Sequence, residues 1–313
     1  MTTYKGIRGV TLRTVEGDIS PVAVGEIWYD SSAKVIKVGK LVPGAWASGG
    51  NMNSGRKHLG GTATSQTAAL AFGGTPPETT YGNLSETYDG TSWTETSELV
   101  NKKSGRGSVG INTAALAVGN LDGTISPSVG THNEEWDGSS WSEEADLNAA
   151  RFDLACFGTV TAAIAAGGDA YPATPSNKVE SWDGSSWTET TEVNTARGEG
   201  ATGSSGTLST AGLIFGAVQP ISTAGNQVES WNGSAWTEVT ELSTARCGCQ
   251  GSGTQTAAMA MGGAQSETYV ESWDGSSWTE IADLSTGRTN AGAGGTTSNS
   301  VLFGGTTIPG YAR

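Results

Sequence analysis

The sequence predicts an all-β fold, a six-bladed β-propeller with four-stranded blades, from a repeated motif, its spacing and the lack of helical periodicity. Nearly the same eleven residues, VESWDGSSWTE, run from 179 to 189 and return at 228–238 and 270–280. The second tryptophan of the motif recurs six times at intervals of 42–49 residues, at Trp46, Trp93, Trp141, Trp187, Trp236 and Trp278. Repeats of about 40–50 residues built from short strands are typical of propeller blades.

Each repeat is expected to contain four strands in a fixed order. The first consists of tiny residues, as in GEGATGSSG at 198–206, which suit the crowded centre of a ring. The second is a small apolar run that ends at or near glycine, as in AIAAGG at 163–168. After a loop of variable length, VESW and WTE form the third and fourth strands, and Asp-Gly supplies the tight turn between them. The recurring tryptophans are expected to fill the space between neighbouring blades.

The ring is expected to close through a composite blade from the two ends of the chain. Residues 289–305 supply the first two strands of a unit, whereas KVIKVGKLVPGAWAS at 34–48 has the pattern of the last two strands with nothing before them. Joining the two halves removes the exposed sheet edges that an open array would leave. The predicted domains are therefore an N-terminal arm and hairpin, residues 1–33, and a propeller, residues 34–313.

The repeat resembles that of kelch-type propellers. In that family a glycine pair ends the second strand, a tryptophan opens the fourth, and an arginine lies near the next blade; here one unit reads Gly167–Gly168, Trp187 and Arg197. Asn120 and Ala217 stand where two other units would have the second glycine, so the tight turn is expected to differ there.

A second resemblance lies in VGEIWYDSSAKVIKV at 24–38. It is similar to a short hairpin near the termini of tailed-phage virion proteins, and the chain as a whole is similar to kelch-like tail-fibre-like proteins of marine phages. The resemblance implies a virion protein made in the host cytoplasm, with residues 1–33 attached to other virion proteins. The alternative interpretation is that residues 24–38 form an extra strand pair that covers the composite blade.

Composition disfavours several functional classes. The formal net charge is −14 and the pI is near 4.5, so nucleic acid is not expected as a partner. No apolar stretch approaches 18 residues, so no membrane insertion is expected. Two histidines without metal-binding spacing and three cysteines, read as small buried residues, predict no metal site and no cofactor. Because most carboxylates recur with the repeat, we do not expect an enzyme.

Two sets of residues are candidates for a site. A basic residue follows each second tryptophan by ten positions, at Arg56, Lys103, Arg151, Arg197, Arg246 and Arg288. These six form either a basic collar around one mouth of the channel or structural ion pairs with repeated acids such as Glu189 or Glu238. The second set lies in or beside the variable loops between second and third strands, where recognition is usually carried: Tyr81, Tyr171, Tyr269 and His132.

These observations lead to three functional hypotheses. The first is a non-enzymatic virion surface protein, in a tail or fibre or as decoration, whose propeller binds a host-surface glycan or protein or another virion protein. The second is a soluble carbohydrate-binding propeller lectin. The third is a carbohydrate-active enzyme, which would need an essential acid outside the repeats.

Overall fold

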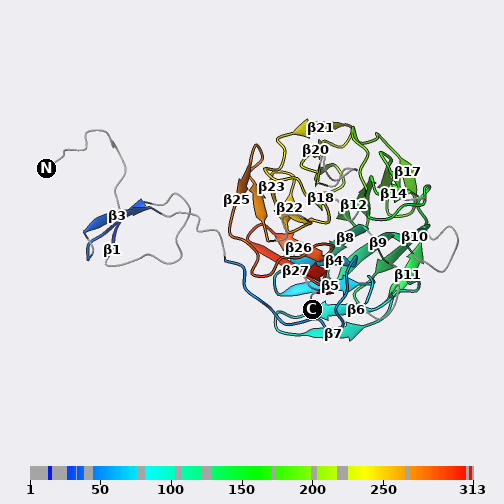
Figure 1. The fold of residues 1–313 in the computed structure, drawn as a ribbon, viewed down its shortest axis with the longest axis horizontal. Coiled ribbons are helices and arrows are strands. Elements are labelled where there is room, and N and C mark those ends of the chain that lie inside the picture. The colour runs from blue at the N-terminus through cyan, green and yellow to red at the C-terminus, as the bar shows by residue number, and fades with distance from the viewer. Residues whose placement is uncertain are drawn as a thin grey trace. The chain divides into compact units, whose positions relative to one another are not determined.

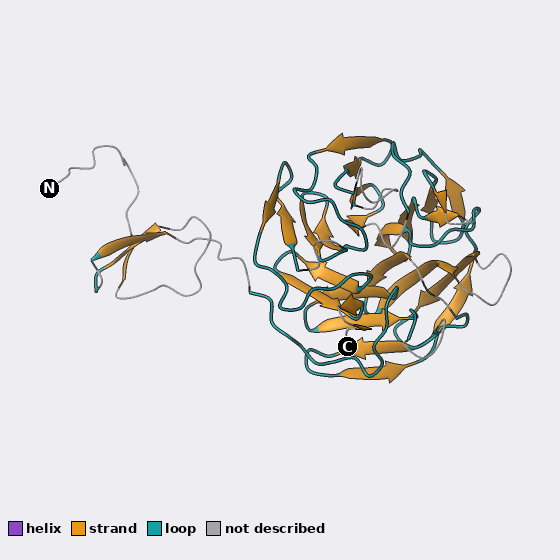
Figure 2. Cartoon of the chain, in the orientation of Figure 1, coloured by secondary structure: helices purple, strands orange, loops and turns teal. Residues whose placement is uncertain are grey.

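All the secondary structure in the described part of this computed structural model is β-strand (Figure 2). That part also contains no helix with the length and hydrophobicity needed to span a membrane. The structure describes residues 13–15, 27–32, 34–38, 45–76, 82–102, 104, 107–121, 129–170, 174–198, 203–216, 225–264, 268–307 and 310–311.

The chain divides into two compact units, Met1–Gly44 and Ala45–Arg313. The first contains a three-stranded sheet in which β2 (Ile27–Asp30) lies between β1 (Arg13–Val15) and β3 (Val35–Val38). β2 and β3 form an antiparallel hairpin, and β1 runs parallel to β2. The hairpin expected within 24–38 is therefore present, but the boundary between units falls after Gly44 and not after residue 33.

The second unit is a β-propeller, with the first strand of each blade nearest the centre and the fourth at the periphery (Figure 1). The first two blades contain β4 (Gly60–Ser65), β5 (Ala68–Phe72), β6 (Ser85–Tyr88) and β7 (Trp93–Thr96), then β8 (Gly107–Ile111), β9 (Ala114–Leu121), β10 (Val129–Trp136) and β11 (Trp141–Glu144). The third contains β12 (Ala155–Thr159), β13 (Ala162–Ala166), β16 (Val179–Trp182) and β17 (Trp187–Glu189). The fourth and fifth contain β18 (Gly203–Leu208), β19 (Ala211–Phe215), β20 (Val228–Trp231) and β21 (Trp236–Val239), then β22 (Gln250–Thr254), β23 (Ala257–Met261), β24 (Val270–Trp273) and β25 (Trp278–Glu280). Two short hairpins complete the strands, β14 (Asp169–Ala170) with β15 (Thr174–Pro175) and β28 (Thr306–Thr307) with β29 (Gly310–Tyr311).

The sixth position in the ring holds a two-stranded sheet, β26 (Gly292–Thr296) with β27 (Asn299–Phe303). The prediction of six four-stranded blades is therefore wrong, since the described residues form five. β3, which was expected in the composite blade, pairs with β2 instead, because a hairpin to an adjacent strand costs less loop-closure entropy than a distant pairing. The first strands still contact one another in a closed order, β4, β8, β12, β18, β22, β26 and back to β4.

The two tryptophans of each motif play different parts. Trp182 donates from Nε1 to the carbonyl of Val160 at 2.8 Å, which fastens the turn between β12 and β13. Trp187, 5.3 Å away between ring centroids, lies in a buried cluster with Leu116 and Val118 of the preceding blade. In other blades the second tryptophan lies against an aromatic ring of the preceding sector, in the pairs Trp93–Phe303, Trp141–Phe72, Trp236–Phe157 and Trp278–Phe215. Trp46 packs on the cluster between the fifth blade and β26–β27. The second tryptophans thus fill the boundaries between sectors.

The glycine pair that ends most second strands is replaced in the second blade, with the expected effect on the turn. Gly168 in the third blade has φ 84°, and a Cβ there would lie 2.6 Å from the carbonyl oxygen of Phe152. Asn120, at the same position of the repeat, continues the strand, so that β9 runs on to Leu121 and pairs with a longer β10. Ala217 lies outside the described residues.

An aspartate side chain organises the turn between the third and fourth strands. Asp183 Oδ1 accepts hydrogen bonds from the N–H groups of Ser185 and Ser186, both at 2.8 Å, and from the Ser185 hydroxyl. Gly184 has φ 93°, a left-handed conformation that glycine adopts readily. The same hydrogen bonds form at Asp89, Asp137 and Asp274, and Asn232 makes them in the fourth blade.

These hydrogen bonds predict that acid weakens the blades. They lower the pKa of Asp89, Asp137, Asp183 and Asp274 to about 2. In Asp183 the Ser185 hydroxyl contributes most, and in the other three the N–H of the serine three positions on contributes most. A carboxyl whose pKa is depressed by folding stabilises the protein above its ordinary pKa, and this stabilisation is lost as the pH falls towards the depressed value.

We therefore expect the free energy of unfolding to fall more steeply between about pH 4 and about pH 2 in the wild type than in a variant with all four aspartates changed to asparagine. Urea titrations at a series of pH values measure this difference. Asparagine is the matched replacement because Asn232 makes the same turn without a charge. Identical acid profiles for the two proteins would contradict the role given to the turns.

Candidate functional site

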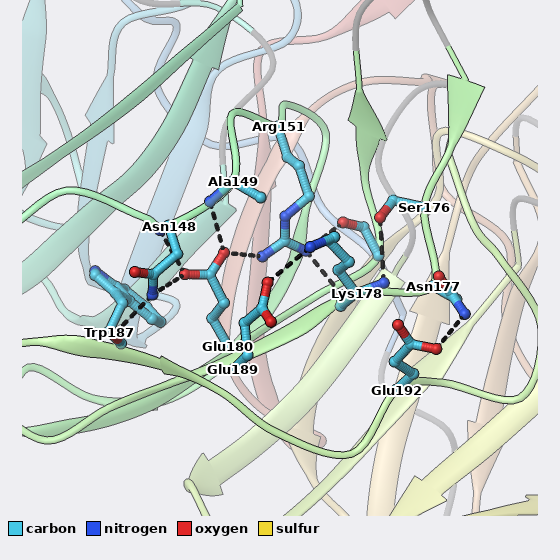
Figure 3. Close-up of polar contacts among 11 residues, drawn as sticks. Asn148, Ala149, Arg151, Ser176, Asn177, Lys178, Glu180, Trp187, Glu189 and Glu192 are labelled. Atoms are coloured by element: carbon cyan, nitrogen blue, oxygen red, sulfur yellow. Dashed lines mark hydrogen bonds and ion pairs between the residues drawn. The ribbon is translucent and has the colours of Figure 1, made fainter.

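The repeated arginines and a repeated glutamate form buried ion pairs. Arg151 Nη2 lies 2.8 Å from Glu180 Oε1, and both side chains are fully buried (Figure 3). The same arginine donates from Nη1 to the carbonyls of Gly167 and Lys178. The equivalent buried pairs in three other blades are Arg56–Glu86, Arg197–Glu229 and Arg246–Glu271. These four arginines are therefore internal and do not form a basic collar; their partners lie on the third strands, not at Glu189 or Glu238 on the fourth.

The second oxygen of each glutamate is also held. Glu180 Oε2 accepts from the N–H of Asn148 at 2.7 Å, three residues before Arg151. Burial lowers the pKa of Arg56 and Arg197, whereas Glu86 and Glu229 respectively act in the opposite direction. Because each pair ties the third strand to the segment that enters the blade, the repeated charges serve the scaffold.

The remaining two basic residues differ from these four. Lys103 lies outside the described residues, although Glu134 of its blade is buried and accepts from the N–H groups of Val100 and Asn101. Arg288 is partly exposed and donates from Nη1 to the carbonyl of Gly304 at 3.2 Å. Its pKa is lowered by burial alone.

Residues that do not repeat converge at the centre of the ring. His58, Asp153, Gly248 and Asn290 each lie two residues after the repeated arginine, just before a first strand. The N–H of His58 donates to the carbonyl of Asn290 at 2.9 Å, and the N–H of Asn290 donates to the carbonyl of Gly248 at 2.9 Å. His58 Nδ1 lies 4.0 Å from Asp153 Oδ1, although their blades are not adjacent. We call these four residues the axial cluster.

The backbone of the axial cluster is strained. His58, Asp153 and Asn290 have φ values of 51°, 53° and 54°, and Gly248 has φ 64°. A left-handed conformation at a residue other than glycine costs about 1–3 kcal/mol and is concentrated at functional sites. Three such residues at one position of the repeat, with three different polar side chains, therefore mark this position as a candidate site.

The side chains of the axial cluster suit a ligand rich in hydroxyl groups. Burial lowers the pKa of His58, opposed by Asp153, so the neutral imidazole offers one donor and one acceptor. Asp153 is 5% exposed and offers carboxylate acceptors, and Asn290 Oδ1 is buried with no hydrogen-bond partner. At 4.0 Å, His58 Nδ1 and Asp153 Oδ1 are too far apart for a direct hydrogen bond.

The variable loops begin on the same face as the axial cluster. Isolated bridges join the residue after the repeated arginine to the residue that follows the glycine pair, in the pairs Lys57–Thr75, Phe152–Asp169, Cys247–Ala264 and Thr289–Thr306. Each of these loops therefore starts opposite the residue that precedes a member of the axial cluster.

The two loop residues that the structure describes, Tyr269 and His132, lie in different blades. Tyr269 is 38% exposed and belongs to the fifth blade. His132 lies in β10 of the second blade, on the opposite side of the ring, with Nδ1 3.5 Å from Asp146 Oδ1. Tyr81 and Tyr171 lie outside the described residues, so their part in binding stays a prediction.

The cysteines and potential metal ligands add no further site in the described part of the chain. Cys156, Cys247 and Cys249 are buried and form no disulfide, and burial raises the pKa of Cys156 to about 12. The described residues contain no group of three or more histidine, cysteine, aspartate or glutamate side chains placed to hold a metal ion.

Sequence reasoning overlooked the axial cluster, although a signal was present. The residue two positions after each basic residue is His58, Gly105, Asp153, Glu199, Gly248 or Asn290. A position that varies in chemistry within an otherwise regular repeat, and that is filled only by glycine and polar residues, indicates both a special backbone and a blade-specific role.

Comparison with known proteins supports the fold and goes no further. No model of a known protein family matches the chain, and no curated protein matches it. Among solved structures, 295 chains are similar. One, "Structure of YjhT", superposes with a TM-score of 0.68 and 12% identity over 84% of this chain and 95% of that chain. At this identity the likeness shows the fold alone, and propellers serve unrelated functions. The chain is a β-propeller.

Proposed function

We propose that the chain is a non-enzymatic binding protein of a phage virion, in which the propeller recognises a surface glycan at the axial cluster. The observation that carries this proposal is the axial cluster itself. It gathers blade-specific polar side chains on a strained backbone, whereas the four buried arginines are neutralised within the scaffold. Sugar hydroxyls both donate and accept, which matches the imidazole, carboxylate and amide groups present.

The division of the chain supports an attachment role for its N-terminal part. The unit Met1–Gly44 has its own sheet, built on the hairpin that resembles those of tailed-phage virion proteins. On purified particles, antibody labelling at a fibre or tail would support host recognition, and labelling over the capsid would support decoration. Glycan binding by a chain that is absent from particles would instead favour a soluble lectin.

The binding site is tested with a glycan array and variants that tolerate the left-handed backbone. We expect His58→Asn, Asp153→Asn and Asn290→Gly each to weaken binding of the best glycan, and Asp153→Asn by about 10- to 100-fold, because it removes a charged hydrogen-bond acceptor. Asparagine and glycine accept positive φ, so the change in chemistry is separated from backbone strain.

The loop residues provide the matched comparison. Under the axial proposal, His132→Ala and Tyr269→Ala bind the same glycan with unchanged affinity. Loss of binding in these two variants, with the axial variants unaffected, would move the site to the loops. Cleavage of any arrayed polysaccharide by the wild type would overturn the non-enzymatic assignment.

A further inference from the structure

The sixth sector repeats the arginine segment of the fifth blade without the glutamate that accompanies it. Residues 243–246 read STAR and residues 285–288 read STGR. In the fifth blade, Glu271 Oε2 accepts from the N–H of Ser243 at 2.8 Å and from its hydroxyl at 2.6 Å, while Arg246 Nη2 holds Oε1. Three donors therefore form a binding site for one carboxylate.

Arg288 is oriented as its counterpart is. Arg246 Nη1 donates to the carbonyl of Gly262 at 3.2 Å, and Arg288 Nη1 donates to the carbonyl of Gly304 at 3.2 Å. Both glycines are the first of a pair that ends a second strand. Among the described residues, no carboxylate forms an ion pair with Arg288. Arg288 is partly exposed, and Ser285 is exposed.

Among the described residues, the second strand of the sixth sector has an unpaired edge. In the five complete blades, the second strand pairs with the first on one side and with the third on the other. β27 is the second strand of the sixth sector, and within the described residues it pairs with β26 alone. A strand edge with unpaired backbone groups binds an extended segment by strand addition.

This chain does not supply the missing acid in the register of its own repeat. Each paired glutamate, such as Glu180 or Glu271, precedes the second tryptophan of its blade by seven positions. Seven positions before Trp46 the residue is Gly39. The carboxylate that matches Arg288 must therefore come from elsewhere.

We propose that the sixth sector binds an extended acidic segment of a partner protein, which adds to β27 as a third strand and places a glutamate on Arg288 and Ser285. The complete blades show how such a segment is held: by antiparallel pairing to the second strand and by the three carboxylate donors. We expect the segment to be acidic, because the Arg288 guanidinium is partly buried and has no carboxylate partner among the described residues. The proposal does not depend on the axial cluster or on the identity of any glycan.

The test uses a labelled peptide of sequence NKVESWDG, residues 177–184 of this chain, and the full-length protein. Fluorescence anisotropy is expected to show saturable binding. Replacing the peptide glutamate by glutamine, or Arg288 by glutamine in the protein, is expected to weaken binding by about 10- to 100-fold. Ser285→Ala, which keeps the N–H and loses the hydroxyl, is expected to weaken it by about threefold to tenfold.

Lys178→Gln is the matched control, because it removes an exposed positive charge from another blade and should leave peptide binding unchanged. Thermal unfolding of each variant verifies that it is folded, and Ser285→Ala retains a test of the site if Arg288→Gln does not fold. Absence of binding to the wild type, or equal affinity for the glutamate and glutamine peptides, would overturn the proposal. If Lys178→Gln weakened peptide binding equally, binding would depend on net charge alone, and this result would also overturn the proposal.

Discussion

Replacing Arg151 by alanine is expected to lower the free energy of unfolding by about 3–5 kcal/mol, one of the largest effects of any single substitution in the chain. Arg151 and Glu180 are both fully buried at 2.8 Å. Removal of the guanidinium leaves the carboxylate in the interior with only backbone N–H and Asn148 amide donors, and it leaves the carbonyls of Gly167 and Lys178 without their arginine donor. Urea denaturation of the full chain, followed by tryptophan fluorescence, measures the change.

An exposed ion pair in the same blade provides the control. Lys178 Nζ lies 2.7 Å from Glu189, with 45% and 58% of the two side chains exposed (Figure 3). Lys178→Ala is expected to change stability by less than about 1 kcal/mol, because solvent screens exposed pairs. A double variant, Arg151→Met with Glu180→Leu, is expected to be more stable than Arg151→Ala, because it leaves no unpaired buried charge. Equal effects of Arg151→Ala and Lys178→Ala would contradict the scaffold role of the buried pairs.

Trp182→Ala is expected to cost about 3–5 kcal/mol, as large-to-small changes in a core do. The side chain is 1% exposed, packs against the Trp187 ring in a tilted arrangement and donates to the carbonyl of Val160. The variant therefore loses the buried packing of the indole, the aromatic pair and the hydrogen bond that fastens the β12–β13 turn. Chemical denaturation of the variant against the wild type measures the cost.

Phenylalanine substitutions separate the hydrogen bond from the packing. Trp182→Phe loses the Nε1 donor and leaves the Val160 carbonyl unpaired, whereas Trp187 Nε1 has no hydrogen-bond partner to lose. Trp182→Phe is therefore expected to destabilise the protein by about 0.5–1.5 kcal/mol more than Trp187→Phe. The reverse order would show that the first tryptophan does not fasten the turn.

The repeat in the sequence was sufficient to predict the blades, but not their number. Tryptophan spacing, Asp-Gly turns and tiny first strands correctly indicated a propeller of four-stranded blades. The pattern of Val35–Val38 matched a blade strand equally well, yet it pairs with its neighbour β2. Alternating apolar residues identify a strand without identifying its partner, so the closure of the ring was beyond the sequence.

The ion pairs show a similar limit. Glu180 and Glu189 are directly opposite each other on β16 and β17, so either one matched the repeated arginine in spacing. Only the packing of the blades decides that Glu180 is buried and Glu189 exposed. The axial cluster was harder to predict from the sequence, because His58 and Asp153 approach one another only once the ring is closed.

Residues that follow the repeat and residues that depart from it therefore have different roles. Residues that recur in most of the complete blades hold the scaffold together, as Arg151, Glu180 and Trp182 do. Positions where the repeat changes, at the axial cluster and beside Arg288, are the places where we propose that a ligand and a partner bind. This division makes the exceptions the first residues to mutate for function.

A crystal structure of the full chain bound to the glycan selected by the array tests the central claim most directly. In this structure we expect sugar hydroxyls within about 2.6–3.2 Å of the side chains of Asp153 and Asn290. A glycan seated on Tyr269 or His132, with the axial cluster untouched, would contradict it.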